Sequence, residues 1–143
     1  MRQPLTLIGL AILWLGGAAT AARADSLSIV IENIEASEGT IMLQLMAGEQ
    51  EFAGEANPVA SFMQRAQSGE LTISTSGLPS GDYAIRVMHD RNDNGELDAN
   101  FVGMPTEPWA FSNNATGSFG PPGWEQVKFA HQGDTVQRIR LNN

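Results

Sequence analysis

The segment from Asp90 to Asp98 carries oxygen-bearing side chains at the spacing used by calcium-binding loops. If Asp90 is counted as the first place, Asp or Asn fills the first, third, fifth and ninth places and Gly95 fills the sixth. Calcium takes roughly six to eight oxygen ligands, and a glycine permits the sharp reversal that aims them at one point. The sequence therefore predicts a calcium site. Its expected ligands are Asp90, Asn92, Asn94, Glu96 through its backbone carbonyl, and Asp98.

This segment departs from the helix-loop-helix calcium motif at the twelfth place. Phe101 stands where that motif needs a bidentate Glu, and no helical pattern flanks the loop. The site must then be completed by Asp98, by water, or by Asp93 or Glu107, and we expect a weak dissociation constant of about 10⁻⁴ to 10⁻³ M. A second interpretation stays open, in which the Asn- and Gly-rich segment is a turn whose side chains bond their own backbone.

His89 beside Asp90 could form the base and orienter of a hydrolase. Such a pair needs a nucleophile or an activated water within about 3 Å of the imidazole. Ser112 and Ser118 have no recognisable base beside them, and the chain shows no nucleophile elbow, no phosphate-binding glycine loop and no paired carboxylates. We therefore expect His89 to cap the edge of the core and the protein not to be an enzyme.

The stretch from Asp90 to Gly123 shows no sustained apolar periodicity, yet it holds more aromatic residues than any other part of the chain after the N-terminal segment. Long loops are usually functional or disordered, and buried aromatic rings favour order. The pattern predicts a packed lid over one end of the fold. Alternatively, the loop is an exposed platform for a carbohydrate, a peptide or an envelope protein. The residues expected to contact such a ligand are Trp109, Phe111, Asn113 and Asn114.

The elements that must position this loop are short strands, because apolar residues alternate with polar ones. The alternating runs are Leu27 to Ile31, Ile41 to Leu45, Leu71 to Thr75 and Tyr83 to Val87. A period of two indicates half-buried strands. About seven such strands and no long helix favour an all-β protein, folded as an antiparallel sandwich of two sheets.

Three local predictions follow from these runs. Strands at 26–34 and 40–47 are joined by turn residues and should form a hairpin. Residues 58–66 fit a helix or a strand, and we predict a strand. In the last strand Val136 is out of phase with Ile139, which indicates a β-bulge.

The first residues have the layout of a secretory signal peptide. Arg2 precedes an apolar run of about eleven residues, which is shorter than the roughly 20 that a membrane-spanning helix needs. Small residues end in Ala22-Arg23-Ala24, so we expect cleavage after Ala24. This predicts a signal peptide at 1–24, a single domain at 25–143, and a periplasmic or secreted bacterial protein without a stable membrane anchor.

Charge and composition exclude several classes of partner and site. Without Arg2 and Arg23, 6 of the 8 basic residues remain against 16 acidic ones, a formal charge of about −10. Nucleic acids and anionic membranes recruit basic patches, so neither is an expected partner. The absence of cysteine excludes disulfides, thiolate metal sites and a lipidated N-terminal cysteine. We expect a monomeric, soluble domain that binds an unidentified ligand or an envelope protein.

The chain also resembles a bacterial exported family catalogued as domain of unknown function 2141. The resemblance rests on Gly77 to Ala84, on His89 to Asp98, on Phe101 with Gly103 and Pro105, on Phe111 to Ala115 and on Phe119 to Pro122. It implies export and a single domain, and it supplies no activity. The turn at Gly77 to Tyr83 is also similar to that of prealbumin-like and collagen-adhesin B-type sandwiches, which implies a seven-stranded Greek key.

Overall fold

The computed structural model describes residues 24–143, so the predicted signal peptide lies outside the described residues except for Ala24. Within this range no helix is both long enough and apolar enough to cross a membrane. In chain order the elements are β1 (Ser26–Ile34), β2 (Thr40–Met46), α1 (Glu49–Ala53), β3 (Ala60–Arg65), β4 (Gly69–Ser76), β5 (Gly81–Asp90), β6 (Trp109–Phe111), the 3₁₀ helix η1 (Ser112–Asn114), α2 (Trp124–Val127), β7 (Phe129–His131) and β8 (Thr135–Arg140).

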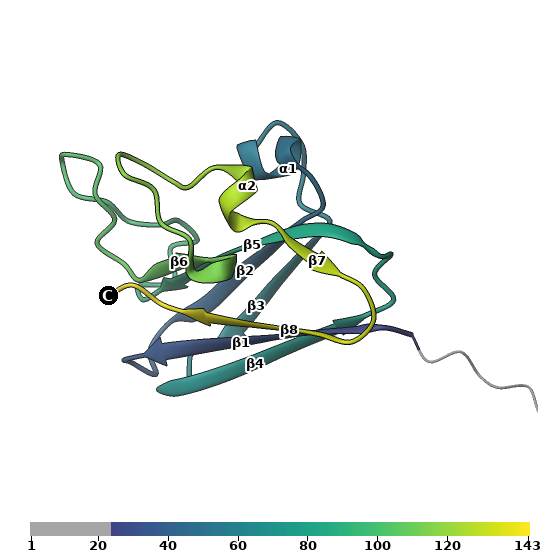
Figure 1. Ribbon diagram of the computed structural model, residues 1–143. Helices are drawn as coiled ribbons and strands as arrows, with labels where there is room; N and C mark the ends of the chain where they lie inside the picture. Colours follow the sequence, from purple (N-terminus) through teal and green to yellow (C-terminus); the bar gives the residue numbers. More distant parts are fainter. Residues whose placement is uncertain (1–23) are drawn as a thin grey trace, which may run out of the picture.

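The strands form two sheets that face each other, which confirms the predicted all-β sandwich (Figure 1). One sheet has the order β4-β1-β8, and the other has the order β3-β2-β5-β6 with β7 also paired to β5. The described residues thus hold eight strands where about seven were expected. The pairing is antiparallel except between β1 and β8, which run parallel.

The core lies between the two sheets. From the three-stranded sheet come the buried residues Leu27, Ile29, Ile31, Leu71, Ile73 and Ile139, and from the five-stranded sheet come Ile41, Leu43, Leu45, Ile85 and Val87. Every second residue of each strand therefore faces inward, as the alternation predicted. A smaller apolar cluster lies on the outer face of the five-stranded sheet, under α1 and α2. It comprises Met46, Phe52, Ala84, Phe111 and Val127, with Trp109 and Trp124 packed against it.

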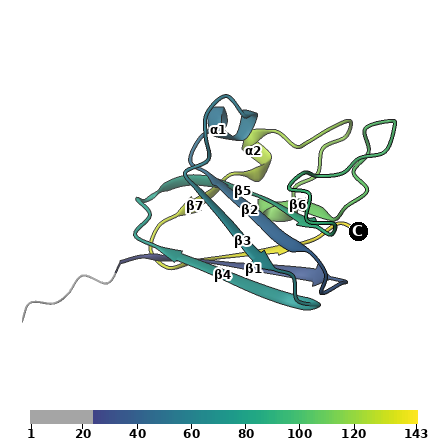
Figure 2. The same cartoon turned by 180° about the vertical axis from the view of Figure 1, so that it is seen from behind.

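The predicted hairpin between the first two strands is wrong, because β1 and β2 lie in opposite sheets (Figure 2). The connection from Glu35 to Gly39 crosses from one sheet to the other, and β2 pairs with β3 and β5 instead. Alternation reports which face of a strand is buried. Alternation does not report which strand is the hydrogen-bonded neighbour. Two strands paired in one sheet and two strands in opposite sheets therefore show the same apolar pattern.

The strand predicted at 58–66 is confirmed as β3, an edge strand of the five-stranded sheet. The bulge predicted in the last strand is wrong. β8 pairs with β1 residue by residue from Thr135 to Arg140, and Val136 points outward with 61% of its surface exposed. The irregularity lies in β1 instead, between Glu32 and Ile34, where Asn33 has a φ of 66°.

The predicted lid over one end of the sandwich is wrong for the outer part of the 90–123 stretch. The side chains of Phe101 and Phe119 are 100% and 106% exposed, so they cannot pack on the sandwich. The inner part does pack, since Phe111 is buried and Trp109 and Trp124 are half-buried. Two short helices, α1 and α2, cover the neighbouring part of the same face (Figure 1).

Candidate functional site

An open groove of 930 Å³ lies on the outer face of the five-stranded sheet, and we call it the sheet groove. Its floor is formed by strand residues, namely Met42, Gln44, Ser61, Met63, Arg86, Met88, Trp109 and Phe111. Its rim is formed by the two loops at the upper left of Figure 1. The apolar rim residues are Leu97, Val102, Met104, Pro105, Phe119 and Pro121. Methionine and aromatic side chains are thus the main apolar groups on the floor of the groove.

Strand register arranges the floor of the sheet groove in rows. Met42 on β2 is the direct partner of Met63 on β3 and of Met88 on β5. Met88 is in turn the partner of Trp109 on β6. The three methionines and the indole therefore form one row across four adjacent strands, which we call the methionine row.

The rim of the sheet groove exposes apolar side chains to solvent. Met104 is 62% exposed, Val102 is 65% exposed and Phe119 is fully exposed. Soluble monomers rarely expose contiguous apolar patches of this kind, and such patches usually mark a binding surface. Hydrophobic and aromatic side chains around a concave surface are also the usual lining of ligand sites. The arrangement is suited to an apolar ligand.

Arg86 and Glu96 are the charged residues that line the sheet groove within residues 24–143. The Arg86 guanidinium donates to the carbonyl of Phe52 at 2.9 Å and lies 5.6 Å from the centre of the Phe52 ring. Burial lowers the pKa of Arg86 from its ordinary value. This residue therefore anchors α1 to the sheet, and the floor offers a ligand little charge.

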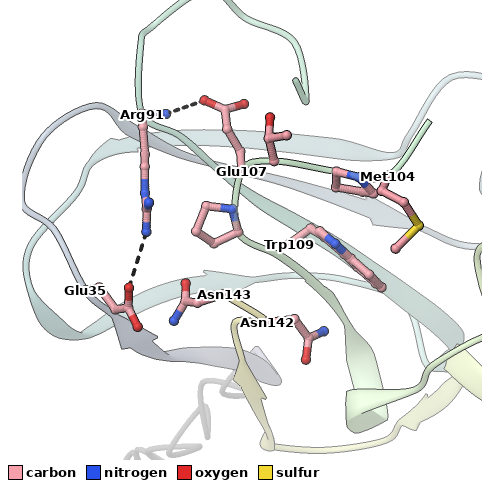
Figure 3. Close-up of a pocket in the computed structure, with 10 residues that line it drawn as sticks. Glu35, Arg91, Met104, Glu107, Trp109, Asn142 and Asn143 are labelled. Carbon is pink, nitrogen blue, oxygen red and sulfur yellow. Dashed lines mark hydrogen bonds and ion pairs between the residues drawn. The ribbon is translucent and has the colours of Figure 1, made fainter. Parts of the chain in front are cut away.

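A second, smaller cleft of 320 Å³ adjoins the sheet groove at the C-terminal end of the chain (Figure 3). Trp109 and Met104 line both hollows. In Figure 3 the Arg91 side chain points toward Glu35, with 3.6 Å between Nη2 and the carboxylate. Asn142 and Asn143 also line this cleft, and Asn143 lies next to Glu35.

The predicted calcium ligand Asp90 is buried and holds the turn together. Its two carboxylate oxygens accept the backbone amides of Asn94 at 3.2 Å and Gly95 at 2.8 Å. The Asn92 side-chain oxygen accepts the Asn94 amide, and the Asn94 side-chain oxygen accepts the Glu96 amide. The segment is therefore a turn whose side chains bond their own backbone.

The structure brings three of the other predicted ligands together at Asp98. The side-chain amides of Asn92 and Asn94 donate to the two Asp98 oxygens at 2.6 and 2.9 Å. Glu96 is exposed to solvent. In the described part of the chain, no three His, Cys, Asp or Glu side chains are grouped so that they could hold a metal ion. Any cation at this turn would depend on amide oxygens.

The two expected helpers, Glu107 and Asp93, already have other hydrogen-bond partners. Glu107 is buried, and its oxygens accept the backbone amides of Arg91 at 2.8 Å and Asp98 at 3.0 Å, which ties the start of the turn to its end. Hydrogen bonds from the Thr40 hydroxyl and the Arg65 guanidinium hold the pKa of Asp93 below its ordinary value. Asp93 thus anchors the turn to β2 and β3.

His89 is completely buried in the sandwich. Its Nε2 donates to the carbonyl of Glu38 at 2.7 Å, and Nδ1 is buried with no hydrogen-bond partner among residues 24–143. A general base must reach the proton it abstracts, either directly or through one water. In this structure the His89 ring is fully enclosed, and neither hollow described above is lined by it.

Among the residues expected to contact a ligand, the structure places Trp109 and Phe111 on the floor of the sheet groove. Asn113 and Asn114 are not part of it. The Asn113 side chain donates to the carbonyls of Gln126 and Lys128, and Asn114 bonds the backbone of β8 at Arg138 and Arg140. Both asparagines have positive φ values of 60° and 50°, so they fasten the turn after β6.

The methionine row was not predicted from the sequence, although the sequence carries a signal for its members. Met42 stands between the inward-facing Ile41 and Leu43. Met63 follows Phe62 and Met88 follows Val87, which also face the core, so each methionine faces outward on its strand. Large apolar residues at outward positions are the available signal. What the pattern lacks is strand register, which brings the three side by side.

No curated protein and no solved structure matches the chain. A family model does match, and its description is uncharacterized protein conserved in bacteria. The match covers residues 29–139, which begins within β1, ends within β8 and includes the whole sheet groove. This confirms the resemblance drawn from the turn and loop residues. The chain therefore belongs to the bacterial family of domain of unknown function 2141.

Proposed function

We propose that the protein is an exported, non-enzymatic binding module that takes an apolar segment of a peptide or envelope protein into the sheet groove. The observation that carries this proposal is the groove itself, a 930 Å³ hollow floored by methionine and aromatic side chains. Flexible methionines adapt to ligands of different shape, as in promiscuous peptide-binding surfaces. The burial of His89 supports a role without catalysis.

A peptide fits this lining better than a carbohydrate, the other ligand expected from the loop aromatics. Sugars need several hydrogen-bonding groups beside an aromatic ring, whereas the floor and rim are mainly apolar. The net charge of the chain is −8, which favours peptides that combine apolar and basic residues. Selection from a displayed library of random peptides should therefore enrich Leu, Phe, Met and Lys or Arg.

Two fully exposed phenylalanines provide a matched test of the groove. Phe119 lines the sheet groove and Phe101 does not, yet both side chains are in solvent and neither supports the fold. We expect Phe119→Ser to lower the affinity for the selected peptide at least tenfold, which is about 1.4 kcal/mol of binding free energy, because the substitution removes an apolar contact. Phe101→Ser should leave the affinity unchanged. Titration followed by tryptophan fluorescence measures both.

Equal affinities for the two variants would contradict this location of the site. Selection of peptides without apolar residues would contradict the proposed ligand class. Oligosaccharides that cause the same change in tryptophan fluorescence would contradict it as well. Because both substituted side chains are exposed, circular dichroism should show the same fold for the native protein and both variants.

Calcium is a second candidate ligand, at the Asp98 carboxylate. It is favoured by the two amide side chains, of Asn92 and Asn94, that already meet this carboxylate. To bind the ion both amides must turn their oxygens toward it, which breaks the bonds that these oxygens make to the turn. That cost is consistent with weak binding.

With a dissociation constant of about 1 mM, calcium at about 10 mM should stabilise the fold by about 1.4 kcal/mol. Thermal unfolding with and without calcium measures this, and Asp98→Asn should abolish the effect. No stabilisation of the native protein would contradict calcium binding. Equal stabilisation of the native protein and the Asp98→Asn variant would contradict calcium binding at Asp98.

Export is proposed from the first residues of the sequence. Cleavage after Ala24 would release a chain that starts at Asp25, one residue before β1. N-terminal sequencing of the protein from a periplasmic or culture fraction should give Asp-Ser-Leu-Ser. An intact Met1 in those fractions would contradict cleavage.

A further inference from the structure

The floor of the sheet groove places three thioether side chains next to one another. Ile41 and Leu43 face the core, so Met42 between them faces outward. Met63 and Met88 are its direct neighbours on the two adjacent strands, and all three line the groove. This juxtaposition depends on register alone, and it brings together residues that are far apart in the sequence.

The spacing allows the three sulfur atoms to meet. Adjacent strands lie about 4.8 Å apart, so the row spans about 10 Å at the backbone. A methionine side chain has three rotatable bonds before its methyl group and can shift its sulfur by several ångströms. Met104 lines the same groove from the loop above and offers a fourth thioether.

Packing of the core does not account for these methionines. Met63 and Met104 are 68% and 62% exposed, and Met42 and Met88 are half-buried at the groove floor. Met46 is the one methionine within residues 24–143 that is buried in an apolar cluster. Four of the chain's 6 methionines therefore gather at one solvent-accessible hollow.

We propose that the methionine row binds a soft monovalent metal ion, Cu(I) with Ag(I) as its chemical equivalent. Thioether sulfur is a soft ligand that selects Cu(I) over the hard cations preferred by oxygen. Trp109, the fourth member of the row, lines the same groove, and aromatic faces attract cations. The groove floor carries one cationic side chain, Arg86, which is engaged with Phe52.

The rest of the chain offers such an ion little competition. There is no cysteine, and both histidines, His89 and His131, are buried. Binding of a soft metal would therefore report on thioethers. This inference goes beyond the proposed function, because it requires sulfur atoms and not merely an apolar surface.

The first test uses silver nitrate and the purified protein labelled with ¹³C at the methionine methyl groups, in chloride-free buffer. One equivalent of Ag(I) should shift the methyl signals of Met42, Met63 and Met88. The signal of Met46, which lies under the helices, should not move. Unchanged signals from the row, or an equal shift of the Met46 signal, would overturn the proposal.

The second test compares a triple variant, Met42→Leu with Met63→Leu and Met88→Leu, with the single variant Met46→Leu. Leucine keeps apolar volume and removes sulfur. The native protein and Met46→Leu should bind one Ag(I) per chain and should withdraw Cu(I) from bicinchoninate under anaerobic conditions. The triple variant should do neither, at unchanged circular dichroism. Retention of one equivalent by the triple variant would overturn the metal site.

The two proposals fail separately in this design. If the sheet groove binds peptides and no metal, Phe119→Ser weakens peptide binding, whereas the native protein leaves Cu(I) with bicinchoninate and its methionine methyl signals do not respond to Ag(I). If it binds metal and no peptide, the displayed library yields no specific sequence while the methyl signals still respond to Ag(I).

Discussion

Replacement of Gly39 by alanine is expected to lower the free energy of unfolding by about 3 kcal/mol or more, the largest effect among the substitutions considered. Gly39 has a φ of +75° and ends the connection between the two sheets. An added Cβ would overlap the Asp90 carbonyl oxygen and lie 2.7 Å from the Cα of Arg91. The strained backbone costs about 1–2 kcal/mol, and overlap with backbone atoms that cannot rotate away costs about 1–3 kcal/mol more.

Gly77 is a close control for this prediction, because its φ of +78° is nearly the same and an added Cβ there would have no atom within 4 Å. Gly77→Ala should cost only the backbone strain, about 1–2 kcal/mol. Urea unfolding of both variants isolates the steric part as the difference. Equal losses would mean that β2 and the Asp90 turn can move apart freely.

Ser112→Ala is expected to destabilise the fold by about 3 kcal/mol. Ser112 is fully buried, and its hydroxyl accepts the amide of Ile85 at 2.9 Å and donates to the carbonyl of Val127 at 2.6 Å. Along this edge of β5 the partner changes from β6 at Arg86 to β7 at Tyr83. The hydroxyl fills the gap, and its loss leaves two buried backbone groups unsatisfied, at about 1–3 kcal/mol each.

The serine prediction has a solvent-exposed control in Ser118, whose replacement by alanine should change stability by less than about 0.5 kcal/mol. Urea unfolding measures the stability loss, and hydrogen exchange reports on the Ile85 amide directly. That amide should lose its protection in Ser112→Ala. If it stays protected, another acceptor has taken the place of the hydroxyl.

Sequence alone predicted the strands well, because alternation is a local consequence of burying one face. β3 was the ambiguous case, because its residues also fit a helix. The predicted strand is the one that forms, at the edge of the sheet. Neighbours in the sheets could not be predicted in the same way. The crossing of Glu35 to Gly39 and the parallel pairing of β1 with β8 depend on contacts between distant residues, which leave no periodic trace.

The candidate site was predicted in part. The aromatic content of the 90–123 stretch drew attention to Trp109 and Phe111, and both line the sheet groove. The oxygen-rich spacing from Asp90 to Asp98 fits a calcium loop and a self-bonded turn equally well, because both place side-chain oxygens at alternate residues of a tight turn. In a calcium loop these oxygens face the ion, whereas here the Asp90 oxygens accept backbone amides. The burial of Asp90 and its bonds to backbone amides distinguish the two arrangements, and residue spacing alone does not reveal burial.

The parallel pairing of β1 with β8 has a consequence for the order of folding. β1 pairs with β4 and with β8, and β8 follows all the other described strands, so this sheet stays open on one side until β8 has been synthesised. Contacts between residues so far apart slow the closing of a fold. We have proposed that the protein is exported. Late closure of this sheet would keep the chain unfolded during synthesis, and an unfolded chain can pass through a translocation channel.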